Sequence, residues 1–285
     1  MRNIFFFLYK NRIVMRVRLS FSILLLLAFS CQPTGENTSD DRASISVLFS
    51  EEVVEEASAA CGKDSSRCTR VLLQYPKVTK AAPAVQARIN DTIEMHVMRL
   101  FTPLSDEDSG SAYIETPEEA AEEFVAVYEA FLMDEPEYAQ AWYAEVQGKL
   151  LFRNSNLATV KLESNTYTGG AHPLFFVDLI TFGLEAGNLV ELSDLIADKP
   201  ALMKLAEKHF RRARGLQAEQ SLQDEGFFWD GSFVLPRNMG LTDKGLYLFY
   251  NPYEVAPYAA GPTEFVIPFQ ALKPLLTKPA ILGLD

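Results

Sequence analysis

Strand-like segments of this chain come in neighbouring pairs joined by short polar turns, and this pairing constrains the fold more than any other feature. Residues 142–152 and 157–167 are strand-like, and the Arg-Asn-Ser-Asn segment between them has the composition of a hairpin turn. Two further hairpins are expected, from residues 172–182 with 189–192 and from residues 233–241 with 246–250. Neighbouring strands joined by tight turns pair antiparallel, which argues against an alternating β-α-β fold.

Helical segments separate these groups of strands. Residues 83–101 carry apolar residues three and four positions apart, which is typical of a helix with one buried face. A second helix is expected to begin at Thr116, because Thr116, Pro117 and Glu119 form the pattern of an N-cap with a capping box. Further elements are expected as strands at 44–56, 69–78 and 264–268 and as helices at 199–214 and 269–276. The sequence therefore predicts an α+β fold, with antiparallel sheets built from hairpins and amphipathic helices packed against them.

The first 31 residues have the parts of a bacterial lipoprotein signal: basic residues, an apolar stretch over residues 19–29, and then Cys31. The stretch is shorter than the roughly 20 residues that a membrane span needs, and it suits a cleaved signal peptide. We expect translation to start at Met1 or Met15 and cleavage to occur before Cys31, whose thiol would carry a lipid anchor. The alternative is an uncleaved signal anchor with Cys31 as an ordinary thiol. Gln32 after the cysteine favours transport to an outer membrane, with the domain facing the periplasm or the exterior.

The chain is expected to comprise four segments. Residues 1–30 form the expected signal peptide, and residues 31–43 form a polar, flexible tether rich in Pro, Gly, Ser and Thr. The folded part is expected to comprise an N-terminal α+β subregion over residues 44–160 and a C-terminal one over residues 161–285. Within the folded part, the acidic loop at residues 102–113 is the best candidate for a boundary between subregions.

The charge of the chain limits the classes of partner. The chain has 26 basic and 38 acidic residues, and residues 1–31 hold five of the basic residues and no acid. The part after the signal would therefore carry 21 basic and 38 acidic residues, a net charge of about −17. This charge argues strongly against nucleic acid, whose phosphate backbone demands a basic surface, and it disfavours anionic lipid headgroups. A cationic protein partner suits it, and so does simple solubility beside a membrane.

Two cysteines, Cys61 and Cys68, flank a short polar loop. In an exported chain such a pair predicts one disulfide, which for so short a loop stabilises the fold by about 2–3 kcal/mol. A zinc site is the alternative, but it needs two more ligands nearby, whereas the three histidines are scattered along the chain. We therefore expect a disulfide, and we expect neither a metal nor a cofactor.

Two segments have compositions unlike those of ordinary turns. The first, residues 167–173, contains paired glycines that allow positive φ angles, and the second, residues 251–262, combines three prolines with two tyrosines and a glutamate. The candidate binding residues in these segments are Tyr167, Gly169, Gly170, His172, Tyr253, Glu254 and Tyr258.

Three interpretations of these residues stay open. The glycines and prolines fix the geometry of the loops, while His172 and Glu254 satisfy buried backbone groups or each other. Alternatively the segments bind a ligand or partner, or His172 and Glu254 perform acid–base catalysis. No nucleophile elbow and no His-Glu-x-x-His pattern occurs in the sequence, so we assign no catalytic residue.

Two other segments are secondary candidates for partner binding. The Phe-Phe-Trp-Asp-Gly run at residues 227–231 would form an exposed patch if its rings point outward. Arg211, Arg212 and Arg214 lie at the end of the expected helix 199–214. We expect these arginines to compensate the negative end of the helix dipole and the last carbonyls, or else to form a basic patch for a partner.

The motifs Tyr-Thr-Gly-Gly-Ala-His at 167–172 and Tyr-Glu-Val-Ala-Pro-Tyr-Ala-Ala-Gly at 253–261 resemble an uncharacterised bacterial extracytoplasmic family. Its members include the ectodomain of a lysozyme-sensing anti-sigma factor and a module found beside polysaccharide deacetylase domains. The resemblance is specific over residues 160–275 and weaker over 44–160, where Tyr75-Pro76 and Asn90 fit it. It implies an α+β extracytoplasmic domain and, from the anti-sigma member, lysozyme binding. We expect neither the transmembrane helix of that member nor an attached deacetylase domain.

The sequence thus predicts an envelope-anchored lipoprotein whose domain binds, without catalysis, an envelope component such as peptidoglycan or a secreted cationic protein such as lysozyme. One alternative is a cell-wall or glycan hydrolase or deacetylase that uses His172 and Glu254. Another is a structural protein whose only task is envelope assembly.

Overall fold

The computed structural model describes residues 46–101, 114–138 and 140–284. Cys31, the expected signal peptide and tether, and the acidic loop at residues 102–113 lie outside the described residues. The described residues belong to one compact unit, which includes every described core residue. No helix in the described ranges is both long and apolar enough to cross a membrane.

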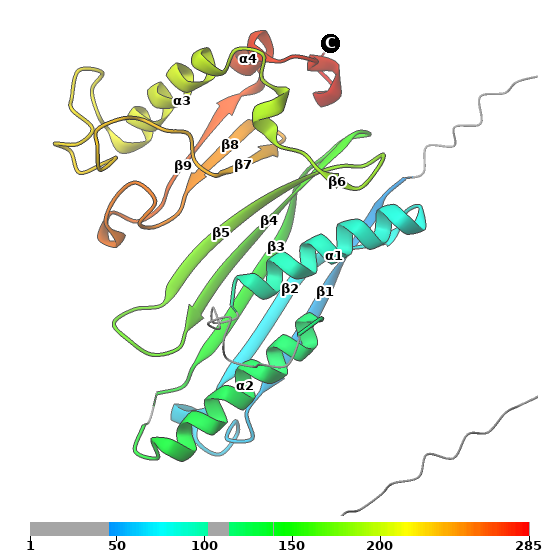
Figure 1. The fold of residues 1–285 in the computed structure, drawn as a ribbon, viewed down its shortest axis with the longest axis vertical. Coiled ribbons are helices and arrows are strands. Elements are labelled where there is room, and N and C mark those ends of the chain that lie inside the picture. Colours follow the sequence, from blue (N-terminus) through cyan, green and yellow to red (C-terminus); the bar gives the residue numbers. More distant parts are fainter. Residues whose placement is uncertain (1–45, 102–113, 139, 285) are drawn as a thin grey trace, which may run out of the picture. The chain divides into compact units, whose positions relative to one another are not determined.

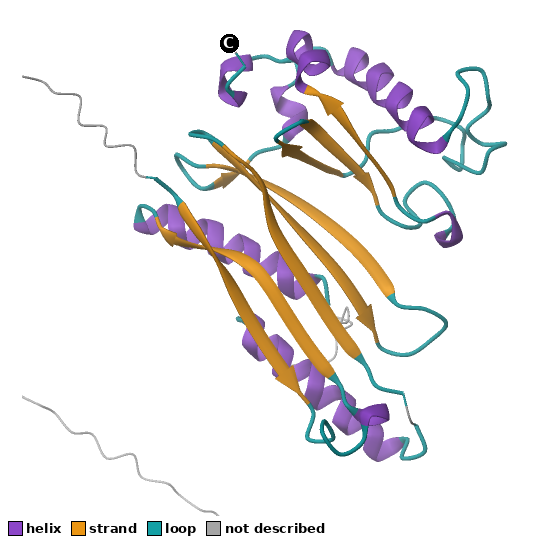
Figure 2. Cartoon of the chain, turned by 180° about the vertical axis from the view of Figure 1, so that it is seen from behind, coloured by secondary structure: helices purple, strands orange, loops and turns teal. Residues whose placement is uncertain are grey.

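A six-stranded sheet with two helices on one face makes up the first part of the unit (Figures 1 and 2). Its strands, in spatial order, are β1 (Leu48–Ala57), β2 (Arg70–Lys80), β3 (Tyr143–Arg153), β4 (Leu157–Tyr167), β5 (Leu174–Gly183) and β6 (Asn188–Leu189). The helices α1 (Pro83–Arg99) and α2 (Pro117–Asp134) lie between β2 and β3 in the chain. Strand β4 spans residues 157–167, and the sheet continues to Leu189.

The α+β class is confirmed, with one pairing that the hairpin pattern did not predict. Strands β2 and β3 are parallel, whereas the other neighbouring strands of both sheets are antiparallel. The connection between β2 and β3 carries two helices, and such a long crossover lets the chain return in the same direction. The first sheet is therefore mixed, with one parallel pair among antiparallel ones.

The parallel pairing stops where the sequence places Pro76. Residues 70–74 of β2 pair with residues 143–147 of β3, and beyond them Pro76 has no N–H to donate. Asn90 of α1 takes the place of the missing strand: its side-chain oxygen accepts from the Val78 N–H at 2.7 Å and its amide donates to the Val78 carbonyl at 3.1 Å. Asn90 thereby fixes α1 on the edge of β2.

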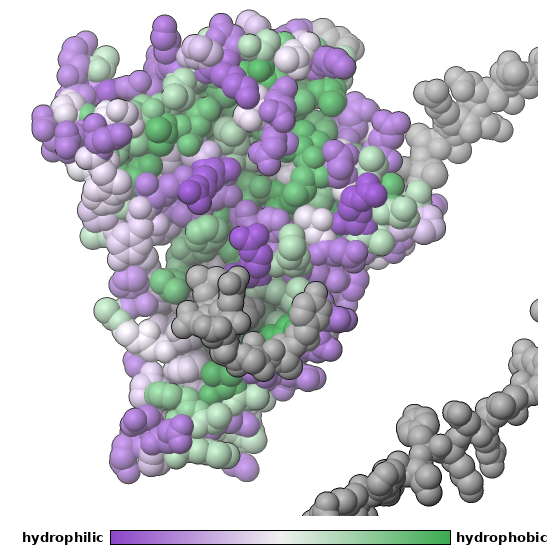
Figure 3. All heavy atoms as spheres, viewed as in Figure 1, coloured by the Kyte–Doolittle hydropathy of each residue, from purple (hydrophilic) through white to green (hydrophobic). Residues whose placement is uncertain are grey.

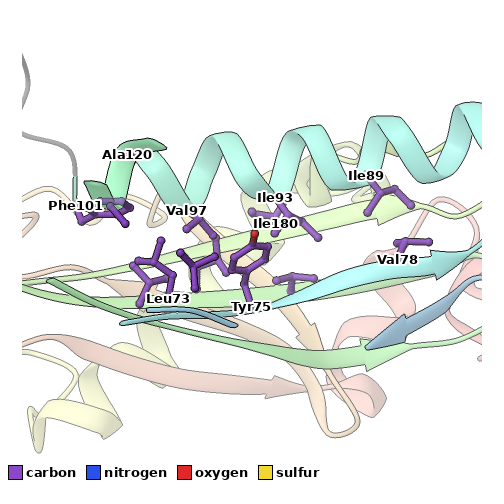
Figure 4. Packing of buried hydrophobic residues seen from close by; sticks show 14 of the residues in the cluster. Leu73, Tyr75, Val78, Ile89, Ile93, Val97, Phe101, Ala120 and Ile180 are labelled. Atoms are coloured by element: carbon purple, nitrogen blue, oxygen red, sulfur yellow. The ribbon is translucent and has the colours of Figure 1, made fainter. Parts of the chain in front are cut away.

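The apolar faces of α1 and α2 form the first core with the sheet. Val85, Ile89, Ile93 and Val97 of α1 are buried, as their spacing predicts, and they lie over residues such as Leu73 of β2 (Figure 4). Complete burial stabilises each of these side chains by about 1.5–3 kcal/mol. Helix α2 begins with the expected capping box, because Thr116 accepts from the Glu119 N–H and Glu119 accepts from the Thr116 N–H. The disulfide between Cys61 and Cys68 is present.

A three-stranded antiparallel sheet, covered by α3, makes up the second part of the unit. It consists of β7 (Asn238–Thr242), β8 (Gly245–Tyr250) and β9 (Thr263–Pro268), with α3 (Lys199–Arg214) packed against β9 and α4 (Phe269–Leu272) following it. Residues 233–237 were expected to extend β7, but Phe233 packs instead in an aromatic cluster around Phe210 of α3. The expected last helix shortens to α4 and one 3-10 turn, because Pro274 interrupts it.

The two sheets pack through one face of β5. Successive strand residues point to opposite faces, so Val177 faces Tyr247 and Phe249 of the second sheet, whereas Ile180 joins the core under α1. Gly240 of β7 allows a close approach, since an added Cβ would lie 3.0 Å from Thr159 of β4. Strand β5 is therefore buried on both sides over its second half.

Candidate functional site

The two motif segments meet at one end of β5. Tyr167 ends β4, Gly169, Gly170 and His172 lie in the β4–β5 connection, and Tyr253, Glu254 and Tyr258 lie in the β8–β9 connection. The ring of His172 stacks on the ring of Tyr258, with centroids 3.9 Å apart and planes 15° apart. The Tyr258 hydroxyl also donates to the Pro173 carbonyl at 3.0 Å.

A third ring extends this contact toward solvent. The Tyr253 ring lies 5.5 Å from the Tyr258 ring, between centroids, and 58% of Tyr253 is exposed. We call His172, Tyr258 and Tyr253 the aromatic stack. The stack offers one exposed ring that is supported by two partly buried ones.

Glu254 holds the loop that carries the aromatic stack. One of its carboxylate oxygens accepts from the Arg237 N–H at 3.1 Å, and the other accepts from the Asn251 N–H at 2.9 Å. Its neighbour Tyr253 has a φ of 67°, a left-handed conformation that costs a bulky residue roughly 1–3 kcal/mol. The bonds of Glu254 on both sides help to keep Tyr253 in this strained conformation.

His172 is used in a separate interaction. Its Nδ1 lies 2.8 Å from the Pro173 carbonyl, which can only accept, so Nδ1 carries the proton and donates. Among the described contacts, none joins His172 to Glu254. The two side chains therefore do not form the hydrogen-bonded acid–base pair that the catalytic alternative supposed.

The glycines of the first motif have the conformation that their sequence predicted. Gly169 and Gly170 both have a φ of 99°, which a residue with a Cβ rarely adopts. A Cβ on Gly169 would also lie 3.1 Å from the Tyr138 hydroxyl oxygen. The Tyr167 hydroxyl donates to the Gly170 carbonyl at 3.0 Å and closes the turn.

Two buried asparagines, Asn251 in the second motif segment and Asn238 at the start of β7, bind the second sheet and its loop to β5 of the first sheet. The Asn251 side chain accepts from the Val177 N–H at 2.8 Å and donates to the Val177 carbonyl at 2.9 Å. The Asn238 side chain donates to the same carbonyl at 2.9 Å and accepts from the Leu179 N–H at 3.1 Å. These amides replace a neighbouring strand along β5. Sequence reasoning missed Asn238, although a polar residue at the start of a buried apolar strand is a signal for such a role.

Arg214, the last residue of α3, fixes the other end of the second segment. Its guanidinium donates to Thr263 Oγ1 at 2.7 Å and to the carbonyls of Ala260, Gly261 and Pro262 at 3.0–3.1 Å. The sequence predicted that Arg214 would act on the last carbonyls of its own helix. The bonds of Arg214 to the β8–β9 connection were missed, because nothing local in the sequence links residues so far apart.

The Phe-Phe-Trp segment splits between the core and the surface. Phe228 is buried, and its N–H donates to the Val255 carbonyl at 2.7 Å, which joins the segment to the second motif loop. Trp229 is 61% exposed. Only Trp229 is therefore available for the binding patch that the sequence offered as a candidate.

Two features apart from the motifs were not predicted. His96 of α1 and Asp178 of β5 form a part-buried side-chain hydrogen bond across 82 residues of sequence. A cleft of about 840 Å³ lies at the opposite end of β4 and β5, between the turns at residues 154–156 and 183–188 and the start of α1. Within the described ranges, no group of three or more His, Cys, Asp or Glu residues could hold a metal ion.

Comparisons with known proteins match two separate segments of the chain. Residues 63–175 match the family model described as Deacetylase PdaC, and residues 193–270 match the model described as Protein of unknown function (DUF3298). His172 lies in the first match and Tyr258 in the second, so the aromatic stack joins the two matched segments. Among curated proteins, none matches this chain.

Two solved structures of the DUF3298 family share the fold. The protein from Bacteroides fragilis has a TM-score of 0.65 and 19% identity, with 85% of this chain and 98% of that chain covered. The protein from Pseudomonas aeruginosa has a TM-score of 0.58 and 20% identity, with 84% and 99% covered. Both comparisons extend over nearly the whole of the solved chains and show a common architecture.

Proposed function

We propose that this protein is a non-catalytic binding protein of the cell envelope and that the aromatic stack forms its contact surface. The observation that carries the proposal is Tyr253, which is exposed at a strained φ and supported on both sides by the bonds of Glu254. Strain of this kind persists where the surroundings fix it, and it is common at ligand contacts. An exposed ring on a stiff support suits recognition, because little conformational entropy is lost on binding.

The acidic character of the protein favours a cationic ligand. The outer face of α2 carries six acidic residues and no basic one, in a chain with 26 basic and 38 acidic residues. We propose a secreted cationic protein, of which lysozyme is the first to test, or peptidoglycan, with the protein anchored through Cys31 to the outer membrane. Opposite charge accelerates the encounter with a cationic protein, and the aromatic stack would supply the short-range contacts to either ligand.

Deacetylase or hydrolase activity is the less favoured alternative. The name of the model matched by residues 63–175 supports it. However, both carboxylate oxygens of Glu254 already accept from backbone N–H groups, so the carboxylate is not free to act as the partner base of His172. A His172→Ala variant that matches the wild type on every glycan tested would leave this alternative without support.

A titration of residues 43–285 against lysozyme and peptidoglycan fragments tests the proposal, at low and at physiological salt. Tyr253→Gly removes the ring while glycine adopts the same φ without strain, so we expect binding to weaken at least tenfold with no loss of stability. Leu189→Ala, which removes an exposed side chain at the other end of β5, is the matched control and should bind as the wild type. Equal binding by the wild type and Tyr253→Gly would remove the aromatic stack from the interface.

A further inference from the structure

A row of unpaired basic residues runs along the exposed face of α3. Lys204, Lys208 and Arg212 are exposed and lie four residues apart, so they share one side of the helix over about 12 Å. In the described part of the chain, none of the three has an ion-pair partner. The hydrophilic surface over α3 is visible at the upper edge of Figure 3.

The other basic residues of α3 are already engaged. Arg211 donates from Nε and Nη2 to Glu207 at 2.9 and 2.8 Å, and it also bonds the carbonyls of Gln217 and Gln220. Arg214 bonds the β8–β9 connection, and Lys199 lies 3.8 Å from Asp194. Among the described contacts, Lys204, Lys208 and Arg212 are therefore the basic residues of α3 without such a partner. We call these three residues the row.

The same row borders a hollow of about 560 Å³. The hollow is lined by Lys204, Glu207, Lys208, Arg211 and Arg212 together with the turn of residues 215–218. Glu207, its one acidic residue, is neutralised by Arg211. Among the described residues that line the hollow, Lys204, Lys208 and Arg212 thus have no acidic residue left to balance their charges.

The helix dipole does not account for this row. Cations favour the negative end of a helix only within its last turn, and Lys204 and Lys208 lie further back in α3. Burial, followed by the charges of Arg212 and Lys208, lowers the pKa of His209, so both basic side chains lie near enough to act on the imidazole. Like charges four residues apart on one face of a helix repel each other weakly in water, and a bound anion would offset this repulsion.

We propose that Lys204, Lys208 and Arg212 form a binding site for a linear phosphate-bearing anion, such as an oligophosphate or a phosphorylated polymer. A phosphate group offers several strong acceptor oxygens, which suit both the fork of an arginine and the ammonium of a lysine. A row about 12 Å long fits successive phosphates better than a single small ion. The net acidity of the chain opposes docking to a broad anionic bilayer. A narrow ligand interacts mainly with charges within a Debye length of about 8 Å, so the basic row outweighs the more distant acidic residues for it.

Isothermal titration of residues 43–285 with tripolyphosphate tests the site, with inorganic phosphate and phosphatidylglycerol vesicles as parallel probes. We expect one saturable tripolyphosphate site at physiological salt, weaker binding of inorganic phosphate and no binding to vesicles. The triple variant Lys204→Gln, Lys208→Gln, Arg212→Gln should weaken tripolyphosphate binding at least tenfold. A control with the same loss of charge, Lys63→Gln, Lys80→Gln, Lys244→Gln, alters exposed lysines elsewhere and should change it less than twofold.

Three results would overturn the proposal: no saturable binding at physiological salt, an equal loss in the two triple variants, or binding to vesicles alone. Circular dichroism checks that both triple variants are folded, as expected for exposed positions. Tyr253→Gly should bind tripolyphosphate as the wild type does, so this site and the aromatic stack are tested separately.

Discussion

Two amphipathic helices of this chain, α2 and α3, each bury one apolar face but carry opposite charges on the exposed side. Helix α2 has six acidic residues and no basic one, whereas α3 has six basic residues and the single acid Glu207. Each helix has some of its charges where they favour its dipole, in the first turn of α2 and in the last turn of α3. The charges in the middle of the helices gain little from the dipole, so folding does not require their sign.

This difference shows that the buried and the exposed faces of a helix are subject to separate constraints. The apolar spacing of α2 and of α3 determines how each helix packs on its sheet. Packing does not determine the sign of the exposed charges, so this sign can suit a binding partner. The partner of α2 would be cationic, and the partner of α3 would be anionic. One compact unit therefore offers surfaces of both signs.

The largest expected effect distinguishes the two cores. Phe210→Ala in α3 removes a fully buried ring that contacts five others, those of Phe227, Phe228, Phe233, Tyr250 and Phe265. We expect it to lower the free energy of unfolding by about 4–5 kcal/mol, against about 3 kcal/mol for Phe124→Ala in α2, whose ring contacts Phe101 and Trp142. Urea unfolding followed by circular dichroism measures both. Equal losses would contradict the idea that the aromatic cluster under α3 is the more tightly packed core.

A second effect concerns the junction between the sheet under α2 and the sheet under α3. Asn251→Ala leaves the buried N–H of Val177 without a partner, so we expect a loss of about 1–3 kcal/mol. Asn188→Ala removes an exposed amide and serves as the control, with a change within about 0.5 kcal/mol. A loss in Asn251→Ala no greater than in the control would show that the junction does not depend on this amide.

Local patterns predicted the elements on both sides of that junction well. The bounds of β4 coincide with the strand expected from its alternation, and α2 begins at the capping box that Thr116 and Glu119 predicted. Such features depend on neighbours within a few residues. The parallel pairing of β2 with β3 and the contact of Asn90 with Val78 depend on register across the sheet, which no local pattern encodes.

The candidate site was predicted in its residues but not in its connections. The sequence singled out His172, Glu254 and Tyr258, yet the contacts of Tyr258 with His172 and Pro173 join two loops that are far apart in the sequence. It also left open whether Glu254 bonds the backbone or His172, and the structure shows the backbone. Distances between loops are set by the packing of the sheets that carry them, which the sequence does not give directly.

A smaller effect compares the two helix starts. Thr116 caps α2, and Asp198 caps α3 by accepting from the Ala201 N–H at 2.9 Å. Thr116→Ala and Asp198→Ala should each lower the free energy of unfolding by about 1 kcal/mol. Asp198→Asn keeps the cap and removes the charge, so it should lower the free energy of unfolding by only about 0.3 kcal/mol. Thermal unfolding of the three variants checks this order. An Asp198→Asn loss as large as that of Asp198→Ala would mean that charge, rather than the cap, stabilises the start of α3.

The smallest expected effect is a pH dependence of stability that arises from α3 and not from α2, because α3 contains a histidine and α2 does not. Burial, followed by the charges of Arg212 and Lys208, lowers the pKa of His209 below its ordinary value of 6.5. The unfolded chain therefore takes up a proton at a higher pH than the folded one. The stability that neutral His209 contributes is complete above pH 6.5 and is lost as the pH falls through the lower folded pKa.

His209→Gln should remove this dependence while keeping a side chain of similar size. We expect the free energy of unfolding of the variant to fall less steeply than that of the wild type between pH 7 and pH 5. Arg212→Gln should flatten the same curve in part, because one of the charges that lower the pKa of His209 is removed. If the curves of the wild type and His209→Gln run parallel, the pKa of His209 is not lowered in the folded protein, and neither burial nor the charges of Arg212 and Lys208 act on it as expected.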